Sequence, residues 1–257
     1  MAVSIAALAG LVWGSFANVL IARIPQGRPW VAEPSRCPRC EQSIAWYDNL
    51  PLVSFALLRG RCRHCKERIS ARYPLVELAV TLTFVGVYGV WGMTITALAF
   101  AYLALISVVL VVIDIDVQRL PDAIVKPSYV IAIVLLSAAV WASGEAWDLA
   151  RMGIGMAALG GFYGAMWLIY PAGLGFGDVK TAGLLGLYGG FLGWPQLALA
   201  GFAGPMLGGL LVLGGLLTGK LTRKSAVPYG PALIAGAWVG YLWGEQVIDA
   251  YMKLVIG

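Results

Sequence analysis

The chain has 257 residues, of which 60% are hydrophobic and only 12% are charged, and its formal net charge is +5. Because a soluble domain carries about 25% charged residues, this composition excludes an ordinary globular protein and indicates one that crosses a membrane several times. Ten of the 18 lysines and arginines lie between positions 23 and 72, so we interpret the positive charge as a membrane-topology signal and not as a nucleic-acid-binding surface.

Eight apolar segments approach or reach the roughly 17–25 residues that a membrane-spanning helix needs. They cover residues 3–22, 75–93, 95–113, 126–142, 150–171, 179–194, 196–218 and 228–246. We therefore predict an all-α polytopic membrane protein with about eight transmembrane helices. The first segment has neither a basic leader nor a convincing cleavage site, which favours a retained helix over a cleaved signal peptide.

The basic residues predict the orientation of these helices. With eight spans, the long loop 23–72 lies on the same side as three other loops, whose basic residues are Arg119, Lys126, Lys180, Lys220, Arg223 and Lys224. Only Arg151 and Lys253 fall on the opposite side. Since loops rich in lysine and arginine stay in the cytoplasm, we expect the long loop inside and both termini outside.

The long loop also contains the chain's four cysteines, arranged as the pairs Cys37–Cys40 and Cys62–Cys65. Disulfides are rare in the reducing cytosol. Two C-x2-C pairs about 20 residues apart are typical of a tetrahedral four-thiolate zinc site. Such a site has no open ligand position, so we predict a structural Zn²⁺ that helps the loop to fold without much of a core. A redox pair and metal-free thiols are the alternatives. His64, the only histidine, is either a substitute ligand or, as we expect, a solvated neighbour.

The third apolar segment ends directly in the acidic stretch Asp114-Ile-Asp-Val-Gln-Arg-Leu-Pro-Asp122. Asp114 is therefore expected at the cytoplasmic end of a helix. Asp122 follows Leu-Pro and precedes an apolar run, which predicts a helix N-cap. We place Asp116 beyond the helix end, solvated or paired with Arg119. These residues alone do not decide whether Asp114 or Asp116 is the functional aspartate.

The stretch Gly173-Leu-Gly-Phe-Gly-Asp178 puts a second carboxylate between two apolar segments. An ionisable group at the edge of a bilayer is first interpreted as functional. The glycines beside it allow another backbone, such as an extended peptide, to come close. The alternative is that Asp178 N-caps the following helix and the glycines form a turn. Lys180 either interacts with Asp178 or a substrate, or extends toward the membrane surface.

On this topology Asp114 and Asp178 lie at the same membrane level. Two carboxylates at a membrane boundary suggest an aspartyl protease pair, in which one activates water and the other polarises the scissile carbonyl. The lone histidine lies away from the apolar core, which disfavours a Ser-His protease and a His-ligated catalytic metal. Pro228-Tyr-Gly-Pro231 opens the last helix and is either part of this site or simply a proline-started helix.

Several short motifs, in this order along the chain, together resemble the type IV prepilin peptidases. They are Gly14-Ser-Phe-Ala-Asn-Val19, Arg23-Ile-Pro25, the two cysteine pairs, Asp48-Asn-Leu-Pro51, Leu58-Arg-Gly-Arg-Cys62, Arg72-Tyr-Pro-Leu-Val-Glu77, Ile113-Asp114, Leu120-Pro-Asp122, Gly175-Phe-Gly-Asp-Val-Lys180 and Pro228-Tyr-Gly-Pro231.

The resemblance implies that Asp114 and Asp178 are the catalytic aspartates, because Asp114 precedes the Leu-Pro-Asp element by the family's spacing. It implies cleavage of the leaders of type IV prepilins or type II secretion pseudopilins at the cytoplasmic face of the bacterial inner membrane. It also implies N-methylation of the new N-terminal residue with S-adenosylmethionine, an activity that the family associates with the cysteine loop. Gly60, Arg61 and Glu77 are our candidates for the methyl-donor site, although the sequence shows no glycine-rich cofactor fingerprint.

We expect a first transmembrane helix over residues 1–24, a cytoplasmic four-cysteine loop over 25–74 and a seven-helix protease region over 75–257. The expected partners are prepilins and the lipid bilayer, with no nucleic acid and an undetermined oligomeric state. One alternative is a presenilin-type intramembrane protease without methyltransferase activity, which would not need the cysteine loop. The other is a non-enzymatic ion-coupled transporter that uses Asp114 and Asp178 as proton or ion carriers.

Overall fold

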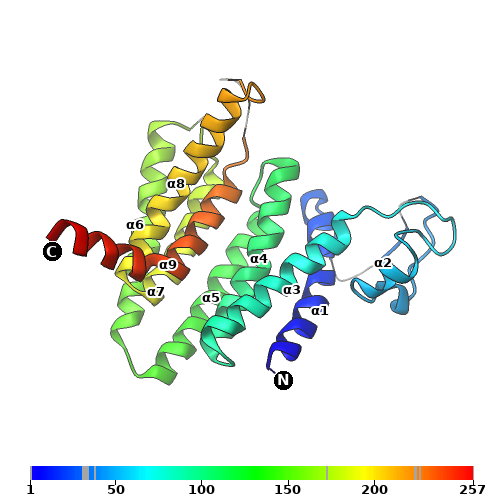
Figure 1. Ribbon diagram of the computed structural model, residues 1–257, viewed down its shortest axis with the longest axis horizontal. Helices are drawn as coiled ribbons and strands as arrows, with labels where there is room; N and C mark the ends of the chain where they lie inside the picture. Colours follow the sequence, from blue (N-terminus) through cyan, green and yellow to red (C-terminus); the bar gives the residue numbers. More distant parts are fainter. Residues whose placement is uncertain are drawn as a thin grey trace. The chain divides into compact units, whose positions relative to one another are not determined.

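The computed structural model describes residues 2–30, 35–37, 39–171, 173–222, 225 and 227–256. In this part of the chain the fold is helical and contains no β-strand, as predicted (Figure 1). The α-helices are α1 (Ala2–Arg23), α2 (Val53–Leu57), α3 (Arg72–Trp91), α4 (Ile95–Val117), α5 (Asp122–Ser143), α6 (Trp147–Ile169), α7 (Phe176–Leu192), α8 (Trp194–Leu217) and α9 (Gly230–Ile256). Two short 3-10 helices, η1 (Ile24–Gln26) and η2 (Trp46–Asn49), lie in the long loop.

Each of the eight predicted apolar segments overlaps one of the eight long helices. Six of these helices, namely α1, α3, α4, α5, α6 and α8, are long and apolar enough to cross a membrane. The remaining two are α7, which has 17 residues, and α9, which carries Glu245, Asp249 and Lys253. The structure thus supports a polytopic membrane protein but does not confirm eight spans. Arg223 and Lys224, which entered the topology argument, lie outside the described residues.

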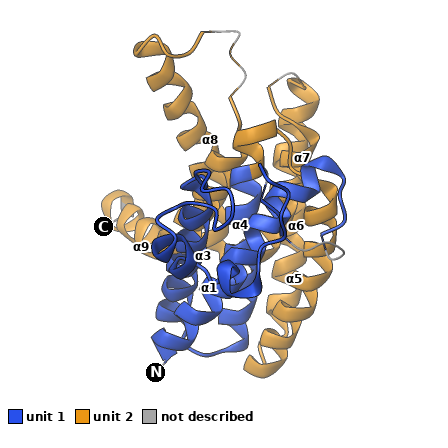
Figure 2. Ribbon diagram, turned by 90° about the vertical axis from the view of Figure 1, so that its right-hand side faces the viewer, with its two compact units in different colours: residues 1–112 blue, residues 113–257 orange. Residues whose placement is uncertain are grey.

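The chain divides into two compact units, Met1–Val112 and Ile113–Gly257, and the division falls inside α4 (Figure 2). In the first unit α1 packs on α3 at small residues. A Cβ added to Gly10 would lie 2.6 Å from Cα of Thr81, and one added to Gly14 would lie 2.7 Å from Cα of Glu77. The two helices can approach this closely only because both positions lack a side chain.

In the second unit α7 is the central helix, with contacts to α5, α6, α8 and α9. Residues 181–190 of α7 are buried without a break. The contact with α6 is again made of glycines: a Cβ on Gly155 would lie 2.3 Å from the carbonyl oxygen of Gly186. At the far end, Arg151 of α6 donates from Nε to the carbonyl oxygen of Gly190, at 2.5 Å, and from Nη2 to that of Phe191, at 2.7 Å. These bonds cap the last turn of α7 and hold the C-terminal end of this helix in place.

Candidate active site

Asp114 lies on the buried face of α4. The helix continues to Val117, beyond the predicted end at residue 113, so Asp116 lies inside the helix and not past its end. Residues two apart in an α-helix point about 200° away from each other. Accordingly Asp114 is buried, with 4% of its surface exposed, whereas Asp116 is exposed. The extended helix thus distinguishes the two aspartates, which the sequence alone did not.

The Asp114 carboxyl group is held by the start of α9. The backbone N–H of Gly230, the first residue of that helix, donates a hydrogen bond of 2.9 Å to Oδ2 of Asp114. A Cβ at position 230 would lie only 2.7 Å from the same oxygen. The Pro228–Pro231 motif therefore contacts an expected site residue directly, in addition to starting a helix.

Asp178 is held in a parallel way by the start of α7. Its Oδ2 accepts a hydrogen bond of 2.9 Å from the backbone N–H of Gly175, which is the N-cap residue of the helix. Asp178 therefore does cap α7, but from the third position of the first turn and not as the N-cap itself. Its other oxygen, Oδ1, is buried and has no hydrogen-bond partner among the described residues. A buried polar atom without a partner calls for an explanation, such as a catalytic role or an ordered water molecule.

The segment that follows α4 connects the surroundings of the two carboxyl groups. Leu120 lies against the first turns of both α7 and α9, because a Cβ on Gly177 or on Gly230 would come within 3.2 Å or 3.3 Å of its side chain. The arrangement brings together two buried carboxyl groups, each with one oxygen fixed by a backbone amide.

One expectation for a nearby charged residue was wrong. Asp122 is not an N-cap: it is the first residue of α5, its N-cap is Pro121, and no side chain caps the helix. Its carboxylate instead forms ion pairs with Lys126, at 2.8 Å, and with Lys180. The Lys180 ammonium group therefore binds Asp122, and it also lies 5.1 Å from the ring centroid of Phe176. The partner of Lys180 is 58 residues away in sequence, which explains why the local pattern did not reveal it.

The four cysteines form one cluster, as predicted. Their sulfur atoms all lie within 4.8 Å of one another, and Sγ of Cys37 is 3.8 Å from Sγ of Cys65. Ligands at the usual Zn–S distance of about 2.3 Å in a tetrahedron are about 3.8 Å apart, so the cluster fits Zn²⁺. His64 does not belong to the cluster. Backbone N–H groups of Cys40 and Arg39 lower the pKa of the Cys37 thiol to about 7, which favours the thiolate that a metal binds.

The cysteine pairs sit in two turns of the same design. The N–H of Cys37 donates to the carbonyl of Gln42, at 3.0 Å, and the N–H of Cys62 donates to that of Glu67, at 2.9 Å. Antiparallel bridges flank both turns, Arg36 with Ser43 and Arg61 with Arg68. The repeated geometry is a further reason to interpret the cluster as a structural metal site.

A cavity of about 750 Å³ lies in the first unit between α1, the cysteine loop and α3. Glu77 lines it, and Oε2 of this residue accepts a 2.9 Å hydrogen bond from the N–H of Leu52. Leu52 has a φ of 58°, a rare conformation for a bulky residue, so Glu77 holds a strained turn. The wall of the cavity also contains the aromatic side chains of Phe16, Phe55 and Tyr73.

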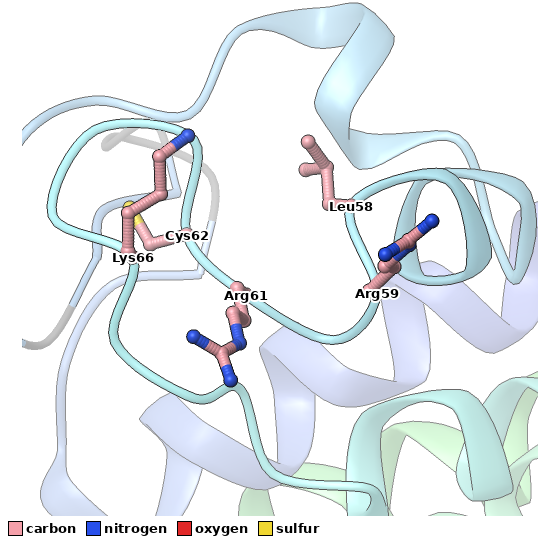
Figure 3. Close-up of a pocket in the computed structure, with 5 residues that line it drawn as sticks. All are labelled: Leu58, Arg59, Arg61, Cys62 and Lys66. Atoms are coloured by element: carbon pink, nitrogen blue, oxygen red, sulfur yellow. The ribbon is translucent and has the colours of Figure 1, made fainter.

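The other two methyl-donor candidates lie elsewhere in the loop. Gly60 has a φ of 64°, and its carbonyl accepts from the N–H of Ile69 beside the second cysteine turn, so its visible role is structural. Arg61 lines a separate cavity of about 380 Å³ together with Leu58, Arg59, Cys62 and Lys66 (Figure 3). The structure therefore does not bring Gly60, Arg61 and Glu77 into one cavity wall.

Sequence reasoning missed three residues that shape the aspartate site: Gly175, Gly230 and Leu120. Two of them act through the backbone N–H and through the absence of a side chain, which residue type alone does not reveal. Their membership of short glycine- and proline-containing motifs was the available signal.

Comparison with known proteins gives consistent matches along the chain. Residues 8–91 match the model of the bacterial peptidase A24 N-terminal domain, and residues 101–213 match the type IV leader peptidase family. Similar curated proteins carry the name prepilin leader peptidase/N-methyltransferase. The protein from Pseudomonas putida is 32% identical over 98% of this chain and 94% of its own length. The one from Stutzerimonas stutzeri is 34% identical over 95% and 91%, and the one from Bacillus subtilis is 29% identical over 99% of both chains. No solved structure matches.

Proposed function

The chain belongs to the type IV leader peptidase family, and we infer that Asp114 and Asp178 are the aspartate pair with which it cleaves prepilin leader peptides. The protein is an aspartic endopeptidase that also methylates the newly exposed N-terminus. One observation above all supports the choice of residues: two buried carboxyl groups each have Oδ2 bound by the N–H of a glycine at the start of a helix, and Oδ1 of Asp178 is buried without a partner among the described residues.

The geometry supports acid–base chemistry shared by the pair. One carboxylate accepts a proton from a water molecule, whose oxygen attacks the scissile carbonyl carbon. The other carboxyl group donates its proton to the carbonyl oxygen, so that a tetrahedral intermediate forms. When the intermediate collapses, the C–N bond breaks and the amine leaves with a proton from the pair. Among the described residues neither aspartate forms an ion pair, so its proton remains available for exchange.

The test is cleavage of a short prepilin by purified protein in lipid nanodiscs. We expect Asp114→Asn and Asp178→Asn each to lower the rate by at least about 10²-fold, since general acid–base groups contribute about 10²–10⁴-fold each. Asp116→Asn is the matched control, because it makes the same change two residues away on the exposed face of α4. Cleavage by either variant at more than a tenth of the wild-type rate, by an order-of-magnitude criterion, would reject the assignment.

We propose that the cysteine cluster holds a structural Zn²⁺, with Cys37, Cys40, Cys62 and Cys65 as its four ligands. All ligand positions would then be protein thiolates, so the ion would stabilise the loop and take no part in catalysis. The two equivalent turns described above support this role.

We further propose that the 750 Å³ cavity binds S-adenosylmethionine, which supplies the methyl group. The cavity lies within the size range of small-molecule sites, about 300–1,000 Å³. Its aromatic side chains suit an adenine ring, and the Glu77 carboxylate suits a cationic centre. Of the candidates named from the sequence, only Glu77 is supported in this way; for Gly60 and Arg61 we propose support of the loop.

Binding of S-adenosylmethionine in the absence of a peptide substrate, measured by calorimetry, tests this site without relying on turnover. We expect Glu77→Gln to weaken binding about tenfold, because a hydrogen bond to a charged group contributes about 1.5–3 kcal/mol. Glu41→Gln, on the exposed first cysteine turn, serves as the control. If Glu77→Gln binds the ligand with unchanged affinity, the cavity is not the S-adenosylmethionine site.

For orientation and substrates, we propose that the cysteine loop faces the cytoplasm of a bacterial inner membrane, with both termini outside. The concentration of basic residues in the loop supports this topology. Type II secretion pseudopilins are proposed as substrates alongside type IV prepilins. The alternatives of a presenilin-type protease and of a transporter are not favoured, because the relatives share the peptidase and methyltransferase name over nearly the full chain.

A further inference from the structure

The two aspartates share a feature that their side chains alone do not show. Each has its Oδ2 bound at 2.9 Å by the backbone N–H of a glycine at the start of a helix: Gly175 for Asp178 and Gly230 for Asp114. In each case a Cβ on the glycine would crowd that same oxygen, at 3.1 Å for position 175 and at 2.7 Å for position 230. The site therefore contains two matched glycine contacts, one at each carboxyl group.

Gly230 is the tighter of the two contacts and the more distant in sequence, 116 residues from Asp114. Real Cβ atoms essentially never approach a heavy atom as closely as 2.7 Å. Either Asp114 or the first turn of α9 would have to move to admit a side chain. The crowded atoms are a buried carboxyl group and Leu120, which also borders Gly177 of α7. A shift at position 230 would therefore be transmitted to the aspartate pair.

We infer that Gly230 is the positioning residue of the peptidase site: its N–H fixes one oxygen of Asp114, and its missing side chain keeps the space that this oxygen occupies. With Oδ2 held by Gly230, the rotation of the Asp114 carboxyl group is fixed. The start of α9 also places a helix N-terminus, which favours negative charge, against this aspartate. This inference rests on the proposed role of Asp114 in cleavage.

Glycine at position 230 is required here for space and for its N–H, not for an unusual backbone conformation, because Gly230 is not among the glycines with positive φ. Alanine could therefore adopt the local backbone, and the defect in Gly230→Ala would come from the collision with Asp114. This makes alanine an informative substitution.

The first test compares Gly230→Ala with Gly209→Ala, whose added Cβ would meet nothing within 4 Å. We expect Gly230→Ala to lower kcat for prepilin cleavage by about 100-fold, since a misplacement of about 1 Å can cost that much. KM should stay within about threefold of wild type, because the substrate-binding surface is otherwise unchanged. Gly209→Ala should match wild type in both parameters.

A second variant removes only the hydrogen bond. Cell-free translation into nanodiscs can place glycolic acid at position 230, so that an ester oxygen replaces the N–H and no atom is added near Asp114. We expect kcat to fall by about tenfold or more with little change in KM, because the lost bond is one to an ionisable carboxyl group. If Gly230→Ala fails to fold, the ester variant still tests whether the N–H of Gly230 positions Asp114.

Wild-type kcat in the ester variant, or in a folded Gly230→Ala protein, would overturn the inference. An equal loss of kcat in Gly209→Ala would also overturn the inference, because the effect would then not depend on a contact with Asp114. If Asp114→Asn itself leaves cleavage intact, the proposed aspartate pair is rejected, and the role of Gly230 with it. If Asp114→Asn abolishes cleavage but position 230 tolerates both changes, only the role of Gly230 is rejected.

Discussion

The proposed catalytic role of Asp178 can be separated from its capping role by the choice of substitution. Its Oδ2 accepts the N–H of Gly175 and so closes the first turn of α7, while its buried Oδ1 has no partner among the described residues and is the oxygen we propose for catalysis. Asparagine keeps an oxygen that can accept the Gly175 N–H, whereas alanine keeps none. We therefore expect both variants to lose cleavage but only Asp178→Ala to lose the cap.

The measurable difference is one of stability. By analogy with other helix caps, Asp178→Ala should be less stable than Asp178→Asn by about 0.5–2 kcal/mol. Thermal unfolding in a single detergent checks this, with Asp116→Ala as the exposed control. Equal unfolding temperatures for the two Asp178 variants would show that the bond to Gly175 does not stabilise α7.

A pH effect is expected in the cysteine loop. Arg63 donates two hydrogen bonds to Asp48, at 2.6 Å and 2.8 Å, and these bonds lower the pKa of the Asp48 carboxyl group. A carboxyl pKa below its unfolded value of about 3.9 stabilises the folded state above that pH and ceases to do so as the pH falls through the folded pKa.

Wild type should therefore be more stable than Asp48→Asn at neutral pH, and the difference should be lost as the pH falls below the unfolded pKa and through the folded one. Because Arg63 is half exposed and solvent screens the pair, we expect the difference to be small. Proteolysis of the loop at a series of pH values measures the difference, and effects of pH on the cysteines cancel in the comparison. A gap between the two proteins that persists at the lowest pH would contradict this account.

Among the helices, close glycine contacts determine how α7 is held. A Cβ on Gly186 would lie 2.2 Å from the carbonyl oxygen of Gly155, which neither backbone can accommodate without moving. We expect Gly186→Ala to separate α6 from α7 and to cost about 1–3 kcal/mol through overpacking. Gly153→Ala and Gly161→Ala are controls on α6, since an added Cβ there meets nothing within 4 Å. Equal unfolding temperatures for all three variants would argue against this packing.

The positions of the long helices were predictable because each depends on a local run of apolar residues. Their ends were less so. The sequence placed the end of the third segment before Asp114, whereas α4 continues to Val117 because its last turn tolerates one aspartate on a buried face and another on an exposed face. The ion pair between Asp122 and Lys180 was not predicted either, because the two residues lie on different helices.

The site was predictable to the extent that its residue types are unusual in a membrane. Two aspartates and four cysteines stand out in an apolar chain; the structure brings the four cysteines together and buries both aspartates. The glycine amides of Gly175 and Gly230 were not predictable, because a backbone N–H is present at almost every residue. Only the folded chain shows which amides point at a carboxyl group.

At the scale of the whole molecule, the two chemistries are assigned to different compact units. The proposed methyl-donor cavity and the cysteine cluster lie within Met1–Val112, and the aspartate pair lies within Ile113–Gly257. If this assignment is right, a substitution in one unit should abolish one activity and spare the other. The activity that a variant retains then shows that the variant is folded.

The most direct test is therefore a mixture of Asp178→Asn and Glu77→Gln proteins in nanodiscs, with a prepilin peptide followed by intact mass. Alone, Asp178→Asn should leave the peptide uncleaved yet methylate a pre-cleaved one, and Glu77→Gln should cleave it but, with S-adenosylmethionine below the wild-type Kd, methylate it about tenfold more slowly. Together they should yield the cleaved and methylated peptide. Cleavage by Asp178→Asn, or loss of both activities in either single variant, would contradict the account.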